Sequence, residues 1–155
     1  MRLVLFQPDI PQNVGAALRL GACLRTPVDI IEPCGFPLSA PGVRRAAMDY
    51  ADQIEFTRHS GWTSFQASPQ RKAGRLLLFS TRAALPIHDF VFRPSDLLMV
   101  GRESAGVPDD VHDAADERIF IPLAAGARSF NVTVAAAIGL AEALRQTGLF
   151  PKAST

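Results

Sequence analysis

The sequence predicts an α/β fold in which a mostly parallel sheet is flanked by helices. Short apolar runs alternate along the chain with helix-like segments, which is the pattern of successive strand–helix units. Several runs are almost continuously apolar, as expected of strands that helices cover on both faces of a sheet. The chain has 155 residues, of which 48% are hydrophobic and 20% charged, a composition typical of one globular domain. We therefore expect a single domain over residues 1–151 and a frayed tail over residues 152–155.

Six segments are predicted as strands because each is short, rich in large or branched apolar residues and followed by polar, Gly or Pro residues. They are Arg2–Gln7, Val28–Glu32, Gln53–Arg58, Arg75–Ser80, Asp96–Gly101 and Arg118–Pro122.

Helices are predicted between these strands, over Gln12–Arg25, Pro41–Asp52, Ser60–Ala67 and Pro108–Ala115. Pro41 and Pro108 suit the first helical position, where the missing N–H costs no hydrogen bond, and Ser60 is a suitable N-cap. The last and longest helix is predicted over Ser129–Thr147, where Gly148 and Pro151 end it.

The last helix has no charged residue from Phe130 to Ala141. A helix that is apolar all round is buried on all sides, and a small domain cannot easily surround its terminal helix. We therefore expect a second copy of the chain to cover it in a homodimer. The alternative is a groove within its own domain.

The sequence also indicates the cellular compartment of the protein. The longest uncharged apolar stretch, residues 129–141, is shorter than the roughly twenty residues of a membrane-spanning helix. The N-terminus becomes polar at Pro8-Asp9, too early for a signal peptide. Cys23 and Cys34 lack metal-ligand spacing, and so few cysteines fit a reducing compartment. We expect a cytoplasmic protein without a membrane span or a metal site.

Charge is unevenly distributed, although the net charge is only +1. Residues 41–93 hold eight basic and four acidic residues (+4), whereas residues 94–127 hold two basic and seven acidic ones (−5). A polyanion would meet the first segment and avoid the second. Taken alone, ordinary surface charge explains these counts better.

Three segments carry side chains suited to a functional site. The first runs from Asn13 to Arg19, just after the first predicted strand. The second is Gly101–Pro108, which follows an apolar strand, and ligands of open α/β sheets lie beyond such strand ends. The third joins the last predicted strand to the final helix and contains Ser129 and Asn131.

Each segment alone has an ordinary structural explanation. Asn13, Ser129 and Asn131 all suit helix caps, and Arg19 suits a solvated side chain. Glu103 is explained as well by a solvated loop carboxylate as by function. The second segment is no P-loop, because no Lys-Ser/Thr pair follows its second glycine, and the sequence has no G-x-G-x-x-G, G-x-S-x-G, H-E-x-x-H or C-x-x-C motif.

Together, the three segments resemble the motifs of the SPOUT superfamily of RNA methyltransferases, in its ribose 2′-O-methylating branch. Their order is Asn-x5-Arg, then Gly-x-Glu-x-x-Gly, then Ile-x-Ile-Pro followed by Ser-x-Asn-Val at a helix start. Further pieces resemble the short, single-domain members that act on the wobble position of tRNA, namely Ile30–Phe36, Arg44–Tyr50 and Thr57–His59. The resemblance spans about residues 2–150.

The resemblance implies a C-terminal trefoil knot, which most folds lack, and a homodimer. It also implies S-adenosylmethionine (AdoMet) as cofactor, without a metal. By position, backbone groups of five residues would hold the cofactor: Phe79, Gly101, Ile121, Leu123 and Ser129.

The implied substrate is the anticodon stem-loop of tRNA, methylated on the 2′-oxygen of the wobble cytidine or uridine. Methyl transfer from a sulfonium to a ribose hydroxyl requires alignment of the two atoms and stabilisation of a developing alkoxide. We expect Arg19 to act electrostatically on the phosphate and the hydroxyl, because a guanidinium keeps its proton too firmly to be a general base. Asn13 and Asn131 would orient Arg19 or the ribose, and Glu103 would anchor the loop of the second motif and Arg19.

Candidate phosphate contacts are Arg44, Arg45, Arg58, His59 and Arg128. Ala141 departs from the family pattern, because close relatives can carry there an aromatic residue thought to touch tRNA.

Three other functions compete with this interpretation. A ribosomal-RNA ribose methyltransferase of the same superfamily is disfavoured because those relatives often carry an N-terminal RNA-binding domain, whereas here the first strand starts at residue 2. A non-catalytic knotted RNA-binding factor is disfavoured by the presence of Arg19, Glu103 and Asn131. A nucleotide-binding α/β protein unrelated to RNA is favoured least.

Overall fold

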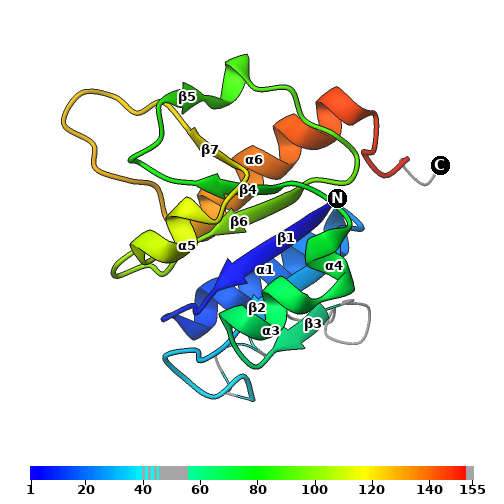
Figure 1. Cartoon of the computed structure of the whole chain (residues 1–155), viewed down its shortest axis with the longest axis vertical. Coiled ribbons are helices and arrows are strands. Elements are labelled where there is room, and N and C mark those ends of the chain that lie inside the picture. Colours follow the sequence, from blue (N-terminus) through cyan, green and yellow to red (C-terminus); the bar gives the residue numbers. More distant parts are fainter. Residues whose placement is uncertain (40, 42, 44, 46–55, 153–155) are drawn as a thin grey trace.

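The computed structural model of this chain describes residues 1–39, 41, 43, 45 and 56–152. Within them, seven parallel strands form one sheet in the order β3-β2-β1-β6-β4-β7-β5 (Figure 1). The strands are β1 (Arg2–Phe6), β2 (Val28–Ile31), β3 (Phe56–His59), β4 (Leu76–Phe79), β5 (Leu85–Pro86), β6 (Leu97–Val100) and β7 (Glu117–Phe120). The predicted parallel α/β sheet is confirmed.

The strand order decides where the functional segments meet. Strand β6 lies between β1 and β4, with Leu3 opposite Leu98 and Leu77 opposite Leu98 in the two ladders. Because parallel strands end at the same edge of a sheet, the loops after β1, β4, β6 and β7 all leave from one edge. The first motif lies in helix α1, which follows the loop after β1, and the other two lie in and beside the loops after β6 and β7.

The helices are α1 (Pro11–Cys23), α3 (Trp62–Ala67), α4 (Pro69–Lys72), η2 (Ile87–Asp89), α5 (Asp109–Asp113) and α6 (Val132–Thr147). Helices α1 and α6 pack with one face of the sheet, in the core cluster that contains Leu3 and Leu5. Helices α3 and α5 pack with the other face, in the cluster that contains Val4 and Phe6. Successive residues of one strand thus point into two cores, which explains the continuously apolar strands.

Several predicted boundaries differ from the structure. Helix α6 begins three residues later than predicted, because Asn131 caps it. Gly61, not Ser60, is the N-cap of α3, and Pro108 is the N-cap of α5, not its first helical residue. In the predicted helix 41–52, residues 41, 43 and 45 are helical, and the others lie outside the described residues, as do residues 53–55 of the third predicted strand.

Three short elements were not predicted. They are the two-residue strand β5, the four-residue helix α4 and the single turn η2. Strand β5 ends in Pro86 and lies at the sheet edge, where a residue without an N–H is tolerated.

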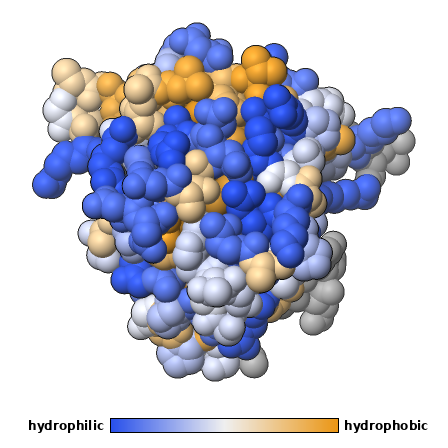
Figure 2. All heavy atoms as spheres, viewed as in Figure 1, coloured by the Kyte–Doolittle hydropathy of each residue, from blue (hydrophilic) through white to orange (hydrophobic). Residues whose placement is uncertain are grey.

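Helix α6 is only partly buried within one chain. Ala136, Gly139 and Leu140 face the core, whereas Val134 is 46% exposed and Phe130, just before the helix, is 40% exposed. Hydrophobic atoms gather on the surface toward the end of the molecule that carries β5 (Figure 2). The single chain therefore leaves part of α6 uncovered, as the expectation of a covering second copy assumes. Its cover by a second copy, like the trefoil knot, stays a prediction.

Candidate active site

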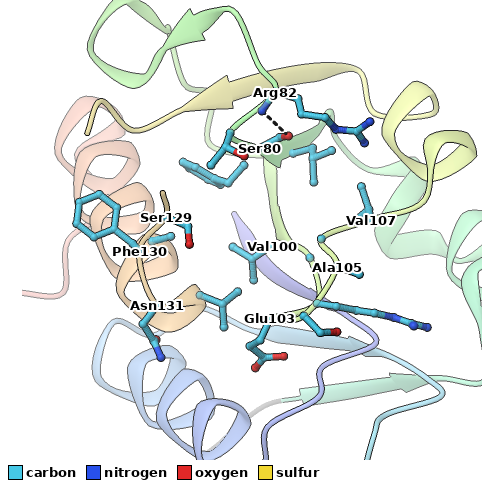
Figure 3. Close-up of a pocket in the computed structure, with 18 of the residues that line it drawn as sticks. Ser80, Arg82, Val100, Glu103, Ala105, Val107, Ser129, Phe130 and Asn131 are labelled. Carbon is cyan, nitrogen blue, oxygen red and sulfur yellow. Dashed lines mark hydrogen bonds between the residues drawn. The ribbon is translucent and has the colours of Figure 1, made fainter. Parts of the chain in front are cut away.

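The carboxyl ends of β4, β6 and β7 border a cavity of about 1000 Å³. Its walls come from the loops after these strands and from the start of α6. Ser129 lies on one side of the cavity and Val107 on the other, Val100 lies between them, and Asn131 and Glu103 both lie toward the lower end of the view (Figure 3). The cavity is large enough for a small-molecule cofactor, at the place where open α/β sheets bind ligands.

All five residues predicted to hold a cofactor line this cavity, although they come from three separate loops. They are Phe79, Gly101, Ile121, Leu123 and Ser129. Aromatic and aliphatic side chains stand there beside hydroxyl and amide groups. Such a mixed lining suits a flat molecule with polar edges, such as a nucleoside.

A chain of hydrogen bonds joins the three motifs along one wall of the cavity. The Asn13 Nδ2 group donates to Glu103 Oε1 at 2.8 Å, and the Asn131 Nδ2 group donates to Asn13 Oδ1 at 3.0 Å. Asn131 Oδ1 in turn accepts from the backbone N–H groups of Thr133 and Val134, at 2.9 and 3.3 Å, which caps α6. Because each amide both donates and accepts, the orientation of both side chains is fixed.

Glu103 ties the loop after β6 to the loop after β1. Its Oε2 atom accepts from the Asp9 backbone N–H at 2.7 Å. The Asp9 carboxylate accepts in return from the backbone N–H of Ser104 at 3.2 Å and from the Ser104 hydroxyl. The hydroxyl contact holds the pKa of Asp9 below its ordinary value. Glu103 thus anchors its loop through Asp9 and Asn13.

The loop after β6 is closed by two backbone hydrogen bonds, and its shape depends on two glycines. Arg102 and Gly106 exchange backbone hydrogen bonds of 2.8 and 2.9 Å. A Cβ atom at Gly101 would lie 2.6 Å from the carbonyl carbon of Gly106, and Gly106 has a φ of 65°. Both positions therefore require glycine for the shape of the loop itself. The Arg102 guanidinium lies over the Phe6 ring, 6.0 Å from its centroid.

Arg19 lies apart from this cluster. It is exposed on α1 and is not among the described residues that line the cavity. Asn13 lies inside α1, whose N-cap is Ile10, so it is not a cap. Because a helix turns once in about 3.6 residues, side chains six residues apart point to different sides. The role of Arg19 stays a prediction that requires substrate on this side of α1.

The arginines predicted to contact phosphate occupy different surroundings. Arg128 is exposed and lines the cavity. Arg58 makes a two-pronged ion pair with Glu32, with distances of 2.9 and 3.2 Å. Arg45 is exposed, and Arg44 lies outside the described residues.

His59 does not belong to such a surface, and its prediction as a phosphate contact is wrong. The residue is 4% exposed, and its Nε2 atom lies 2.7 Å from Oδ1 of the fully buried Asp29. Asp29 also forms an ion pair with Arg2. The His59 and Phe65 rings are nearly perpendicular, with 5.2 Å between their centroids. The His59 ring is therefore part of the protein interior, where it contacts Asp29 and cannot reach a phosphate of bound RNA.

Sequence reasoning missed the ion pair between the loop after β4 and α5. Arg82 Nη1 lies 2.8 Å from Asp109 Oδ1, and the Arg82 backbone N–H donates to Ser80 Oγ at 3.1 Å (Figure 3). All three residues line the cavity. The Arg82 guanidinium holds the pKa of Asp109 below its ordinary value. The available signal was the place of Ser80, the last residue of a predicted strand.

Other classes of site have little support in the part of the chain that the structure describes. There, no three His, Cys, Asp or Glu side chains are grouped as a metal site would need. Burial raises the pKa of Cys34 to about 11, which makes its thiol unreactive at neutral pH. None of the described helices is long and apolar enough to span a lipid bilayer.

Known proteins resemble this chain over nearly its whole length. A tRNA (cytidine(34)-2′-O)-methyltransferase from Beijerinckia indica subsp. indica is 55% identical over 150 residues, which cover 97% of this chain and 94% of the relative. A solved structure described as giving insights into the 2-OH methylation of C/U34 on tRNA matches with a TM-score of 0.88 and 37% identity, and covers 94% of each chain.

A more distant structure shares the fold. The SpoU methyltransferase AviRb from Streptomyces viridochromogenes, solved in complex with the cofactor AdoMet, matches with a TM-score of 0.83 and 24% identity, over 94% of this chain and 60% of that one. The predicted resemblance to SPOUT methyltransferases is thus confirmed. Residues 1–141 match the SpoU rRNA Methylase family, and the chain belongs to that family.

Proposed function

We propose that this protein transfers the methyl group of AdoMet to the 2′-oxygen of the wobble cytidine or uridine in the anticodon loop of tRNA. The observation that carries this proposal is the hydrogen-bond chain Glu103–Asn13–Asn131, which unites three distant motifs on one wall of a cofactor-sized cavity. The names of two relatives support the substrate, since one is called a tRNA (cytidine(34)-2′-O)-methyltransferase and the other concerns C/U34 of tRNA.

The cavity fits AdoMet. Phe79, Ile121 and Leu123 offer apolar contact to an adenosyl group, while Ser129 and the loop after Gly101 offer polar groups to its edges. The fold shared with an AdoMet-bound methyltransferase supports the same assignment. When bound, AdoMet supplies an electrophilic methyl group on a sulfonium.

The residues around the cavity would position the ribose. When the 2′-hydroxyl gives up its proton to water, negative charge develops on its oxygen, and nearby hydrogen-bond donors stabilise this charge until the oxygen bonds to the methyl carbon and the carbon–sulfur bond breaks. An amide NH2 group has two hydrogens, and in the hydrogen-bond chain Asn13 and Asn131 each use one. Their second hydrogens can orient the ribose, and the two side chains need no further ordering when the ribose binds.

Arg19 would act on the substrate and not on the cofactor, because it lies outside the cavity lining on the exposed side of α1. We expect Arg19→Ala to abolish methyl transfer while the dissociation constant of AdoMet stays unchanged. Arg19→Lys should also be poor, because an ammonium does not reproduce the two-pronged contact of a guanidinium with phosphate. Near-normal turnover of the lysine variant would exclude the phosphate role.

The protein would act as a homodimer. Val134 and Phe130 lie four residues apart and leave apolar surface exposed at the start of α6, beside the cavity. Burial of each such side chain contributes roughly 1.5–3 kcal/mol before the costs of association. Val134→Glu should therefore give monomers in light scattering coupled to gel filtration, whereas Ser64→Glu on the exposed side of α3 should not. A wild-type monomer at micromolar concentration would exclude the dimer.

Arg128, Arg58 and Arg45 would contact phosphates of the RNA, with Arg44 as a further candidate. We place the reaction in the cytoplasm, as one methyltransferase domain over residues 1–151 acting on mature or maturing tRNA.

The deciding experiment is methylation of bulk tRNA and of ribosomal RNA with labelled AdoMet, followed by nucleoside mass spectrometry and mapping of the position. We expect 2′-O-methylcytidine or 2′-O-methyluridine at the wobble position. Labelled ribosomal RNA with unlabelled tRNA would favour the second candidate, a ribosomal-RNA ribose methyltransferase, which the name of the matched family suggests.

A further inference from the structure

Gly139 allows helix α6 to contact a wall of the cavity. It lies in the middle of α6, against the ring of Phe79 at the end of β4. A Cβ atom at this position would lie 2.3 Å from Phe79 Cζ, 2.9 Å from Cε2 and 3.0 Å from Cε1. Carbon atoms cannot approach so closely, so any other residue at position 139 would force either the helix or the ring to move.

The helix is the less free of the two to move. At its start, Asn131 and Thr133 both bond to Asn13, the latter through its hydroxyl to the backbone carbonyl at 3.1 Å. Near its end, Gln146 donates to the carbonyl of Phe90 and accepts from the N–H of Phe92, each at 3.0 Å. Ala136, Leu140 and Ala143 of α6 are fully buried in the core.

Phe79 lies between the core and the cavity. Its side chain packs with the core cluster that α6 completes, and it also lines the cavity. A ring displaced from Gly139 would therefore move toward the cavity.

We infer that Gly139 is a positioning residue for the cofactor, because it fixes the ring of Phe79 and thereby the depth of the cavity. The inference rests on the proposed binding of AdoMet in this cavity. Gly139 itself does not line the cavity among the described residues, so it would act entirely through Phe79.

A double-mutant cycle tests this coupling, with S-adenosylhomocysteine as the ligand in calorimetric titrations of the purified protein. Gly139→Ala should raise the dissociation constant about tenfold or more, because the displaced ring would occupy space that the ligand needs. In the Phe79→Leu background, where the ring is absent, the same Gly139→Ala change should alter the dissociation constant less than about threefold.

Gly21→Ala is the matched control. Gly21 is also a helical glycine, in α1, and a Cβ atom there would lie 2.7 Å from the Thr26 carbonyl oxygen and from Val28 Cγ2. It lies outside the cavity lining, so this variant should lose stability in thermal unfolding but keep its affinity for the ligand.

The outcomes separate the two proposals. Absence of binding to the wild-type protein would overturn the proposed function. Binding by the wild-type protein with equal effects of Gly139→Ala in both backgrounds, or an equal loss of affinity in Gly21→Ala, would overturn the positioning role. If Gly139→Ala fails to fold, the double variant decides, because it must bind as Phe79→Leu does.

Discussion

Asn13 and Asn131 lie 118 residues apart in the sequence and share a hydrogen bond of 3.0 Å between their side-chain amides. This contact joins helix α1 to the N-cap of the last helix, α6. A further hydrogen bond from Asn13 to Glu103 connects both to the loop after β6. Both amides therefore hold a helix end and a loop in place, and both line the cavity in which we propose that the reaction occurs.

The first prediction concerns this chain of contacts. Asn13→Ala leaves Glu103 Oε1 and Asn131 Nδ2 without their partner, so the free energy of unfolding should fall by about 1–3 kcal/mol in urea denaturation. Methyl transfer should fall with it, under conditions where the variant is still folded. Thr133→Val removes only the hydroxyl contact to the Asn13 carbonyl, and it should retain most of the activity. Equal activity losses in the two variants would argue against a special role of the Asn13 amide.

The second prediction separates the two glycines of the loop after β6. Gly101→Ala places a methyl group 2.6 Å from the Gly106 backbone, so the loop must open and AdoMet binding should be lost. Gly106→Ala meets no atom within 4 Å, and it costs only the strain of a left-handed residue, about 1–2 kcal/mol. Titration calorimetry should show a much larger loss of affinity for Gly101→Ala, and the reverse order would contradict the described loop.

The third prediction distinguishes RNA contacts from interior residues. Arg128→Gln should weaken tRNA binding and reduce the slope of log affinity against log salt by about 1, because one phosphate contact is lost. His59→Ala should leave that slope unchanged while thermal unfolding shifts to lower temperature, because it deprives buried Asp29 of a partner. A reduced slope in the His59 variant would restore this residue as an RNA contact.

The fourth prediction concerns the dependence of stability on pH. Glu142 accepts hydrogen bonds from Arg145 at 2.8 Å and from Gln146 at 2.7 Å, which lower its pKa from 4.5 to about 2. Because the pKa is lower in the folded protein, the stabilisation is complete above pH 4.5 and is lost as the pH falls toward 2. Thermal unfolding followed from pH 5 to 2 should show a shallower decline for Glu142→Gln than for the wild type. Parallel curves would show that this carboxylate does not contribute.

The strands were predictable because apolar continuity is a local signal. Leu76 to Leu78 and Leu97 to Met99 are buried on both faces of the sheet, and the sequence shows this directly. Their order was not predictable, because the pattern that identifies a strand does not name its neighbours. The placement of β6 between β1 and β4 follows from how the whole chain packs.

The candidate site was also predictable only in part. The motifs around Asn13, Glu103 and Asn131 could be identified from residue types and spacing, together with the resemblance to a known family. The burial of His59 could not, because it depends on Asp29 from another strand, 30 residues away. The ion pair of Arg82 with Asp109 joins two exposed residues 27 positions apart, and neither has a local pattern that marks it.

The strand order has a consequence for synthesis on the ribosome. Strands β1, β2 and β3 can pair as soon as they emerge, but β4 pairs only with β6 and β7, so it waits without a neighbour while the next segment is translated. The cavity wall is then completed only after synthesis of Asn131, near the end of the chain. We therefore expect a polypeptide that is truncated before Asn131 to lack the complete site, so that full binding requires the last helix to be docked.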